Sequence, residues 1–516
     1  MQLLPFQNQR PLDFTQPETL RAMQEALQRT RAAFPLQIPA VVDGQKVDTA
    51  EKIESYNPCR KEGLVAVAAK GDRALADQAL QAAWQAFETW QMTPAEVRAR
   101  YLLATAAEMR RRRYDLCALE VLEAGKSWSE ADGDVNEAID FLEYYARESV
   151  RMAQPVATAP YPGEENTSQY IPLGVGLILP PWNFPLAILT GMTMGPVAVG
   201  NTVILKPASP TPAIGYQLAA ILQEVGLPKG VVNFLPGSGS EVGEYLARHP
   251  QMRFISFTGS REVGTHLFEV GGQVVEGQRW LKRVVAEMGG KDAIVVDESA
   301  DLDAAADGIV TSAFGYQGQK CSACSRVIAV DAVYDTLLEK LVTKTQALQV
   351  GPAEDPKTQV AAVISAQQYE KVLQYVEIAQ TEGRVVVGGH AGDPSGYYIE
   401  PTLVADVDPN ARIAQEEIFG PVVACLRAPN FEAAIDIANQ TVYGLTGAVY
   451  SRNRKHLEYA REHFFVGNLY FNRKCTGSLV GVHPFGGFNL SGTDVKTGSP
   501  EYLLHFMQMK SVSEAL

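Results

Sequence analysis

The chain has 516 residues, of which 46% are hydrophobic and 20% charged, and its formal net charge is −14. This length exceeds the roughly 250–300 residues at which a single core stops growing, so we expect two or more domains. The acidic balance argues against nucleic acid or an anionic membrane as main partner, while a pocket of local positive charge could still bind a small anionic substrate.

The first third of the chain predicts helices. Residues 1–35 form a polar leader, and apolar residues recur at intervals of three and four along four segments: 18–34, 74–87, 98–124 and 135–151. A proline- and alanine-rich break follows at 155–162, and then a strand-like segment at 168–172. The break separates this helical part from a segment in which short strands alternate with helices.

From residue 175 onward, short apolar runs alternate with helical segments. The runs are 175–179, 202–205, 231–235 and 253–257. Such alternation predicts a parallel sheet flanked by helices, with ligands at the carboxyl ends of the strands where the strand order reverses. A second alternating series runs from 293 to about 480, and the tail over 502–512 is predicted to be a strand or a short helix.

Glycines follow two of these strands in the layout of a dinucleotide-binding domain. No G-x-G-x-x-G is present, because the run from Gly237 to Gly243 is one residue too long, and turn glycines explain it equally well. Gly259 and Ser260 end a strand and open a helix, where free N–H groups and the helix dipole can hold a pyrophosphate.

Lys206 follows the strand 202–205 and can reach ribose hydroxyls or a 2′-phosphate. An acidic residue nearby would favour NAD⁺ by repelling that phosphate. The neutral Ser209 stands there instead, so NADP⁺ remains an alternative to NAD⁺.

Cys321 lies in the run Gly315–Ser322, whose two glycines and two glutamines predict a turn that presents a thiol beside the cation of Lys320. A thiol is a nucleophile only as thiolate, and an adjacent cation lowers its pKa. A lone cysteine is more often inert packing. Cys321 and Cys324 form a C-x-x-C pair, but no second pair or spaced histidines complete a zinc site, and a redox dithiol is the remaining alternative.

Three further motifs could serve such a nucleophile. Asn183, in the turn Pro181–Pro185, can donate to a developing oxyanion, and Glu287, beside two glycines, can take a proton from water. Glu417 and Phe419 could hold a ribose and a nicotinamide. Each has a common alternative as a turn or surface residue. Together they define one reaction class, in which a thiol adds to an aldehyde, hydride leaves to a nicotinamide and water cleaves the thioester.

The order of these motifs resembles the aldehyde dehydrogenase superfamily over essentially the whole chain. Six segments carry the resemblance: 181–185, 206–207, 257–260, 287–291, 318–321 and 417–421. It implies an α/β fold with a Rossmann-type cofactor domain, an α/β catalytic domain and a small β-flap that joins subunits. The expected bounds are 1–35 for the leader, 36–154 and 173–286 for the cofactor domain, 287–487 for the catalytic domain, and 155–172 and 488–516 for the flap.

The resemblance also implies roles for individual residues. Cys321 is the expected nucleophile, Asn183 with the Cys321 amide the oxyanion hole, and Glu287 the base for deacylation. Lys206 and Glu417 are expected to hold the two riboses of NAD⁺ or NADP⁺. The other expected cofactor contacts are Trp182, Ser209, Gly237, Gly259, Ser260 and Phe419.

A narrower resemblance is to the 1-pyrroline-5-carboxylate dehydrogenase branch of this family, carried by Cys321-Ser322, by 468–474 and by 476–481. It implies NAD(P)-dependent oxidation of L-glutamate γ-semialdehyde to L-glutamate, the second step of proline catabolism. A substrate carboxylate needs donors at the far end of its pocket, and the Ser322 hydroxyl with the N–H groups of Gly477 and Ser478 forms such a nest. The other expected substrate contacts are Phe184, Phe485, Lys320 and, at the entrance, Glu137.

Two alternatives remain: an aldehyde dehydrogenase for another acidic semialdehyde, such as succinic semialdehyde, and a catalytically silent binding protein on the same fold. Pro180, His483 and Asn489 depart from the family pattern and bear on substrate and cofactor detail. Sparse cysteines and the absence of a signal peptide or of about 18 successive apolar residues predict a cytoplasmic protein. The break at 155–172 and the tail predict a homo-oligomer built from dimers that share a sheet.

Overall fold

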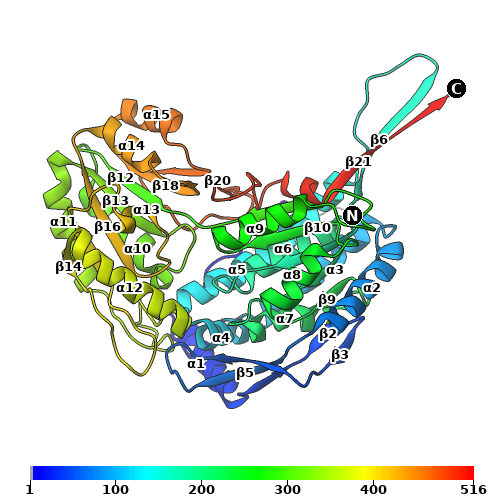
Figure 1. The fold of residues 1–516 in the computed structure, drawn as a ribbon, viewed down its shortest axis with the longest axis horizontal. Helices are drawn as coiled ribbons and strands as arrows, with labels where there is room; N and C mark the ends of the chain where they lie inside the picture. The colour runs from blue at the N-terminus through cyan, green and yellow to red at the C-terminus, as the bar shows by residue number, and fades with distance from the viewer. Residues whose placement is uncertain (1–3) are drawn as a thin grey trace.

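Two seven-stranded sheets, one in each half of the molecule, organise the fold, and a two-stranded ribbon projects from one half (Figure 1). The computed structural model describes residues 4–516. The two halves come from successive parts of the chain, since the sheet of the first uses strands up to Glu287 and that of the second begins at Asp292.

The first sheet has the strand order β11-β10-β7-β8-β9-β2-β3. Its strands are β2 (Ala40–Val42), β3 (Gln45–Val47), β7 (Val175–Leu179), β8 (Thr202–Leu205), β9 (Val232–Phe234), β10 (Phe254–Thr258) and β11 (Arg283–Glu287). Strands β7 to β11 are parallel, whereas β2 and β3 add an antiparallel edge. These pairings confirm the predicted parallel sheet, and β7 and β8 are buried throughout, as expected for strands covered on both faces.

Helices cover this sheet and connect its strands (Figure 1). They are α2 (Arg73–Trp90), α6 (Ala187–Ala198), α7 (Pro212–Glu224), the single π turn η1 (Gly239–Gly243), α8 (Glu244–Arg248) and α9 (Arg261–Gly272). Asp72 caps α2 and Ser260 caps α9 through side-chain oxygens, so both helices start where the sequence offers an N-cap residue.

The N-terminal part packs against this half, with α5 in contact with α6 and α4 in contact with α7. It consists of α1 (Pro17–Ala32), the three-stranded sheet β1-β5-β4 (Leu36–Ile38, Leu64–Ala69, Lys52–Tyr56), α3 (Ala95–Arg111), α4 (Arg113–Ala124) and α5 (Trp128–Met152). The helical segment predicted over 98–124 is confirmed, but it is divided into α3 and α4. The chain leaves helical geometry at Arg112, and Arg113 turns inward to an ion pair with Asp132 at 2.6 Å.

The second sheet has the order β14-β15-β16-β13-β12-β18-β19. Its strands are β12 (Asp292–Val296), β13 (Cys324–Val330), β14 (Arg384–Val387), β15 (Thr402–Ala405), β16 (Val422–Ala428), β18 (Thr446–Tyr450) and β19 (Asn468–Phe471). The helical segments around it are α10 (Leu302–Phe314), the 3₁₀ turn η2 (Gly315–Gly318), α11 (Asp331–Gln346), α12 (Ala366–Glu382), α13 (Arg412–Gln415), α14 (Phe431–Asn439) and α15 (Arg454–His463). A short pair, β17 (Tyr443–Gly444) and β20 (Phe488–Asn489), lies beside this half.

The projecting ribbon pairs β6 (Glu164–Pro172) with β21 (Met507–Ala515) in antiparallel register (Figure 1). It is shorter than the flap expected over 488–516, because the 3₁₀ turn η3 (Tyr502–Phe506) belongs to the core, where Tyr502 stacks on Tyr145 with ring centroids 5.3 Å apart. Within residues 4–516, no helix has the length and apolarity needed to cross a membrane.

Candidate active site

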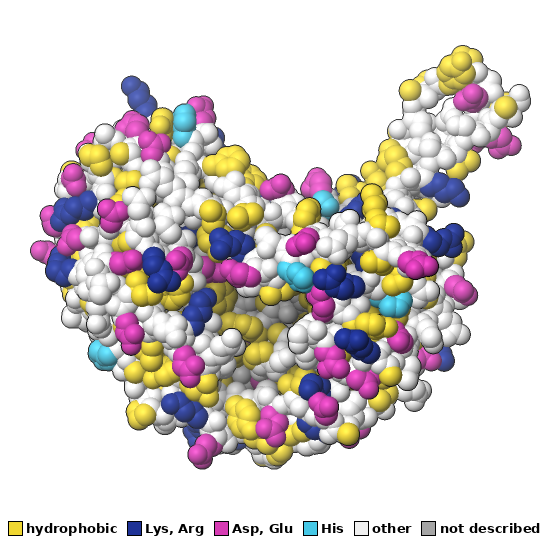
Figure 2. All heavy atoms as spheres, in the orientation of Figure 1, with side chains coloured by type: hydrophobic (Ala, Val, Ile, Leu, Met, Phe, Trp, Pro, Cys, Tyr) yellow, Lys and Arg dark blue, Asp and Glu magenta, His cyan; other side chains and the backbone are white. Residues whose placement is uncertain are grey.

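A cavity of about 740 Å³ lies where the two sheets approach, at the recess between the halves in Figure 2. The first half contributes the loops after β7 and β10, which are neighbours on the side where the strand order reverses. The second half contributes the loops before β12, β13 and β16. Eight predicted site residues line this cavity: Trp182, Asn183, Lys206, Gly259, Ser260, Cys321, Glu417 and Phe419.

The loop that carries Cys321 has unusual backbone geometry. Tyr316 and Gln317 have φ angles of 51° and 57°, in the left-handed region that side chains rarely adopt. The Tyr316 hydroxyl donates to the carbonyl of residue 124 at 3.1 Å, and the Gln317 amide donates to the carbonyls of 125 and 362 at 3.0 and 2.9 Å. Such strain persists when surrounding contacts hold it, and it is typical of functional loops.

Gly318 completes this turn. Its φ is 69°, and a Cβ atom added to it would lie 2.4 Å from the carbonyl oxygen of Gly420. The glycine therefore allows the Cys321 loop to pack against the loop that carries Glu417 and Phe419. The turn predicted from the glycine-rich run is confirmed.

Asn183 connects the two halves beside the thiol. Its side chain is 4% exposed, and its amide nitrogen donates to the carbonyl of Gln319 at 3.0 Å. An amide nitrogen has two N–H donors, so one remains for a ligand in the cavity. Asp134 fixes the end of this loop, because its carboxylate accepts from the N–H of Ala187 at 2.7 Å.

The pKa of the Cys321 thiol is raised well above its usual value, first by burial and then by the carboxylates of Asp292, Glu287 and Glu417. The lowering expected from Lys320 is not found, because Glu130 holds the Lys320 ammonium in an ion pair at 2.7 Å. The resting form at neutral pH is therefore the thiol, and its proton must leave when the sulfur attacks.

Glu287 is the last residue of β11, and its carboxylate is out of contact with solvent. Neither oxygen has a hydrogen-bond partner among the described residues. Burial raises the pKa of Glu287 well above its usual value, and the ammonium of Lys496 opposes that rise. A carboxyl group with a raised pKa is suited to take up a proton, which is the role expected for this residue.

Glu417 approaches the chain at Gly289 and Gly290. It accepts from the N–H of Gly290 at 3.1 Å, and a Cβ atom on Gly289 would lie 2.2 Å from its carboxylate. The rings of Trp182 and Phe419 meet edge to face, with centroids 5.4 Å apart. A carboxylate and two aromatic rings on one cavity wall fit a ribose and a nicotinamide ring.

Of the residues predicted to contact the adenosine part of the cofactor, only some line the cavity. Lys206 lines the cavity, and burial lowers its pKa to about 8. Gly237 lies behind it, where its carbonyl accepts from the Lys206 ammonium at 3.2 Å. Ser209 is exposed and lies outside the cavity lining.

Two lining residues on α12, Gln368 and Lys371, were missed from the sequence. The Gln368 amide donates to the carbonyls of Ile418 and Phe419 at 3.2 and 2.8 Å, and so holds the Glu417 loop. Lys371 adds a cation opposite the start of α9. The two residues lie three positions apart on an amphipathic helix. No sequence motif distinguishes them there from ordinary surface residues.

The residues expected to contact the substrate lie outside the lining of the large cavity. Ser322 is 8% exposed and Phe184 is half-buried, with the Lys126 ammonium 4.4 Å from the centre of its ring. Phe485 is half-buried too. Burial raises the pKa of the half-buried Glu137 to about 8.

The loop after β19 carries Gly477 and Ser478. Gly477 has a φ of 78°, and the Ser478 hydroxyl lies 2.5 Å from the Tyr470 hydroxyl. His483, one of the departures, supports this loop by accepting from the N–H of Leu479 at 3.2 Å.

Pro180 and Asn489, the other two residues that depart from the family pattern, lie apart from this loop. Pro180 lines the large cavity, whereas Asn489 lies in β20 with a φ of 53°. Pro180 has no N–H to offer a ligand there.

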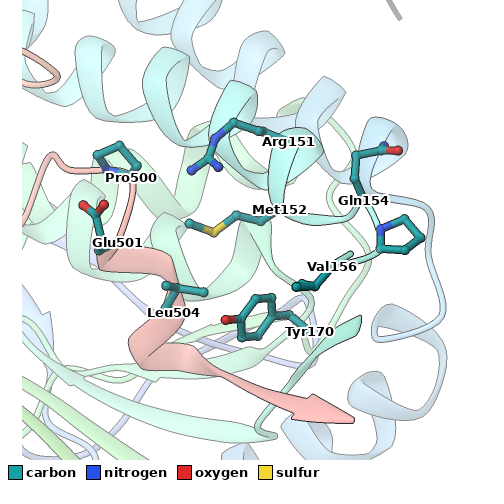
Figure 3. Close-up of a pocket in the computed structure, with 9 residues that line it drawn as sticks. Arg151, Met152, Gln154, Val156, Tyr170, Pro500, Glu501 and Leu504 are labelled. Atoms are coloured by element: carbon teal, nitrogen blue, oxygen red, sulfur yellow. The ribbon is translucent and has the colours of Figure 1, made fainter. Parts of the chain in front are cut away.

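A second hollow, of about 310 Å³, lies at the root of the ribbon, between the end of α5, Tyr170 of β6 and Leu504 of η3 (Figure 3). Its Arg151 is paired with Glu148 at 2.7 Å. The nucleophile and its partners lie elsewhere. Among residues 4–516, no group of three or more His, Cys, Asp or Glu side chains could hold a metal ion.

Comparison with known proteins agrees with this geometry. The aldehyde dehydrogenase family matches residues 45–512. The chain is 53% identical over 510 residues to a 1-pyrroline-5-carboxylate dehydrogenase of a Geobacillus species, and 50% identical over 503 residues to that of Bacillus subtilis, covering 99% and 98% of each chain. The crystal structure of the Thermus 1-pyrroline-5-carboxylate dehydrogenase with bound NAD superposes with a TM-score of 0.99 at 53% identity, covering both chains completely. This chain therefore belongs to the aldehyde dehydrogenase family.

Proposed function

We propose that this protein oxidises L-glutamate γ-semialdehyde, the open form of 1-pyrroline-5-carboxylate, to L-glutamate with NAD⁺, the second step of proline catabolism. The observation that carries the proposal is the junction of Cys321 and Asn183 with a dinucleotide-sized cavity at one sheet edge. The names of relatives about half identical over nearly the whole chain support the substrate.

The reaction begins when the Cys321 sulfur attacks the aldehyde carbon. A C–S bond forms, the electrons of the C=O π bond move to the oxygen, and the thiol proton passes to solvent water. The second N–H of the Asn183 amide and the N–H of Cys321 donate to the oxyanion that develops. Trp182 and Phe419 would hold the nicotinamide ring of NAD⁺, which would supply the acceptor for the hydride that leaves this carbon. The thioester that remains is cleaved by a water molecule whose proton Glu287 takes, and the Cys321 sulfur leaves.

NAD⁺ is the cofactor we propose, with NADP⁺ as the alternative. The Thermus relative carries NAD, and the cavity of this chain offers Lys206, Glu417 and the N-terminus of α9 to its riboses and pyrophosphate. Ser209 is neutral and exposed, so it gives no charge repulsion against a 2′-phosphate.

Steady-state kinetics with L-glutamate γ-semialdehyde and succinic semialdehyde, each with NAD⁺ and NADP⁺, test this function. We expect kcat/KM to favour glutamate semialdehyde by about tenfold or more, because the pocket must match the longer chain and its α-substituents. A preference for succinic semialdehyde would instead support the alternative substrate. If no aldehyde is oxidised with either nucleotide, the protein is a binding protein on this fold.

We further propose a homo-oligomer built from dimers, joined through the β6–β21 ribbon. Among the named strands, β6 and β21 pair only with each other, with one further bridge from Ser168 of β6 to Val156, and β19 is an edge strand of the second sheet. Edge strands present unpaired N–H and C=O groups to another chain, and the ribbon exposes Met509 and Val512 as well. All six cysteines are free, which suits the reducing cytoplasm we propose as its location.

Removing residues 507–516 is expected to convert the dimer to a monomer, because one strand of the ribbon is lost. Size-exclusion chromatography with light scattering measures the mass. Binding of NAD⁺, followed by quenching of tryptophan fluorescence, checks that the rest of the chain stays folded. An unchanged mass would place the interface elsewhere.

A further inference from the structure

The carboxylate of Glu287 lies against the glycine-rich loop around β20. A Cβ atom added to Gly486 would lie 2.9 Å from Oε1 of Glu287, and one added to Gly492 would lie 3.8 Å from its Cδ. The backbone of Glu287 also forms an isolated β-bridge with Gly492. The loop therefore contacts both the side chain and the main chain of the expected base, so a residue that fixes the loop also fixes Glu287.

Lys496 holds this loop in place. Its ammonium donates to the carbonyl of Gly486, to the carbonyl of Gly467 at 2.6 Å and to the amide oxygen of Asn468 at 3.4 Å. Asn468 binds the same segment, because it donates to the carbonyl of Pro484 at 2.9 Å and accepts from the N–H of Gly486 at 3.3 Å. Three acceptors thus surround the three N–H donors of the ammonium, and Lys496 joins the start of β19 to the loop beside Glu287.

These contacts leave the charge of Lys496 without a counterion. All three acceptors are uncharged, and among residues 4–516 no carboxylate forms an ion pair with this ammonium. Burial lowers the pKa of Lys496, and the carboxylates of Glu287 and Asp494 oppose that lowering. Asp494 is exposed, whereas the carboxylate of Glu287 is out of contact with solvent. The positive charge therefore acts mainly on Glu287, since solvent does not screen that interaction.

Within the part of the chain that the structure describes, the other titratable groups that face Glu287 bring no positive charge. The carboxylate of Asp494 raises the pKa of Glu287 further. The Cys321 thiol and the Tyr502 hydroxyl of η3 have raised pKa values, first through burial and in part through Glu287, and both are uncharged at neutral pH. Lys496 is thus the cation that favours the carboxylate form of Glu287.

We propose that Lys496 is a positioning residue for deacylation: it fixes the loop against Glu287 and supplies the positive charge that keeps this carboxylate ready to accept a proton from water. A nearby cation favours the charged form of a buried carboxyl group, which burial alone disfavours. Lys496 is not among the residues that line the large cavity, so it acts through Glu287 and not on the aldehyde. This inference rests on the proposed function, because it takes Glu287 as the base that hydrolyses the thioester.

The test compares Lys496→Met with wild type by stopped-flow absorbance of NADH, with L-glutamate γ-semialdehyde and saturating NAD⁺. The rapid phase reports hydride transfer and should stay within about twofold of wild type, whereas the steady state should slow by about tenfold at about pH 7. The reason is that loss of the cation raises the pKa of Glu287 and leaves less carboxylate. Only the carboxylate accepts a proton, so the difference from wild type should shrink as the pH rises toward about 9.

Three further variants separate charge from loop support. Lys496→Arg keeps the charge and should retain the pH profile of wild type. Lys496→Gln keeps an N–H donor without the charge, so it should behave as Lys496→Met, and it replaces that variant if the methionine protein does not fold. Lys455→Met, at an exposed lysine on α15, is the matched control and should behave as wild type.

A loss of the same size at every pH would show that Lys496 only supports the loop, and an unchanged steady state would leave it no part in deacylation; either result overturns the inference. An alkaline shift in Lys496→Arg as large as in Lys496→Met also overturns it, since charge would not be the cause. Failure of the proposed function gives a different result, in which wild type itself produces no NADH from the semialdehyde.

Discussion

Replacing Cys321 with alanine is expected to lower kcat/KM for aldehyde oxidation by about a thousandfold or more, because no other thiol among the described residues lines the cavity to form the thioester. Asn183 and the nucleotide contacts would remain, but hydride can leave only after the sulfur has added to the aldehyde carbon. Production of NADH, followed by its absorbance, measures the loss.

The control lies three residues along the chain. Cys324 is buried at the start of β13 and its thiol lies against the carbonyl of Arg326, so Cys324→Ala should keep most of the activity. NAD⁺ binding by the Cys321→Ala protein, read from tryptophan fluorescence, should match wild type. Substantial aldehyde oxidation by Cys321→Ala would rule out the thioester route. Loss of aldehyde oxidation in Cys324→Ala as well as in Cys321→Ala would favour the redox dithiol.

The part of the site built from strand ends could be predicted from the sequence. Short apolar runs mark β7, β8 and β10, and the residues that follow such strands meet at one edge of a parallel sheet. Ser260 is predicted in this way from its position between a strand and a helix. Asn183 is predicted differently, from its amide in the proline-bounded turn 181–185.

Contacts between distant segments could not be predicted. Lys126 is completely buried, in an ion pair with Asp134 at 2.6 Å, and its ammonium lies 4.4 and 5.0 Å from the ring centres of Phe184 and Tyr316. It thus lies between the loops of Asn183 and Cys321. In the sequence, however, Lys126 and Asp134 look like charges on a helix surface, since nothing local marks them as buried.

The charges that act on the Cys321 thiol could not be predicted from the sequence either. The sequence places the cation of Lys320 next to Cys321 and suggests a lowered thiol pKa. In the structure, however, Lys320 forms an ion pair with Glu130, 190 positions away in the chain. The carboxylates of Asp292, Glu287 and Glu417 then raise the pKa of the thiol together with burial. Adjacency along the chain says little about which charge a side chain finally meets.

Replacing Glu287 with glutamine is expected to give one rapid burst of NADH, of about one equivalent per active site, followed by turnover slowed by about a hundredfold or more. Hydride transfer needs Cys321 and Asn183 and is retained, whereas hydrolysis of the thioester loses the group that takes the proton from water. Stopped-flow absorbance separates the burst from the steady state. Denaturation with acid during the steady state should trap the acyl group on Cys321, where mass spectrometry detects it.

The pH dependence of this step follows from the raised pKa of Glu287. Only the carboxylate can accept a proton, so wild-type deacylation should increase as the pH rises through that pKa and decline as the pH falls below it; the glutamine variant should lose this dependence. Above the usual pKa of a carboxyl group, the buried Glu287 carboxylate is charged at a cost to the stability of the folded wild type, whereas glutamine carries no charge. The glutamine variant should therefore unfold at a temperature no lower than that of wild type at pH 8. A variant that turns over without a burst would show that Glu287 acts before hydride transfer, as the base that removes the proton from the Cys321 thiol.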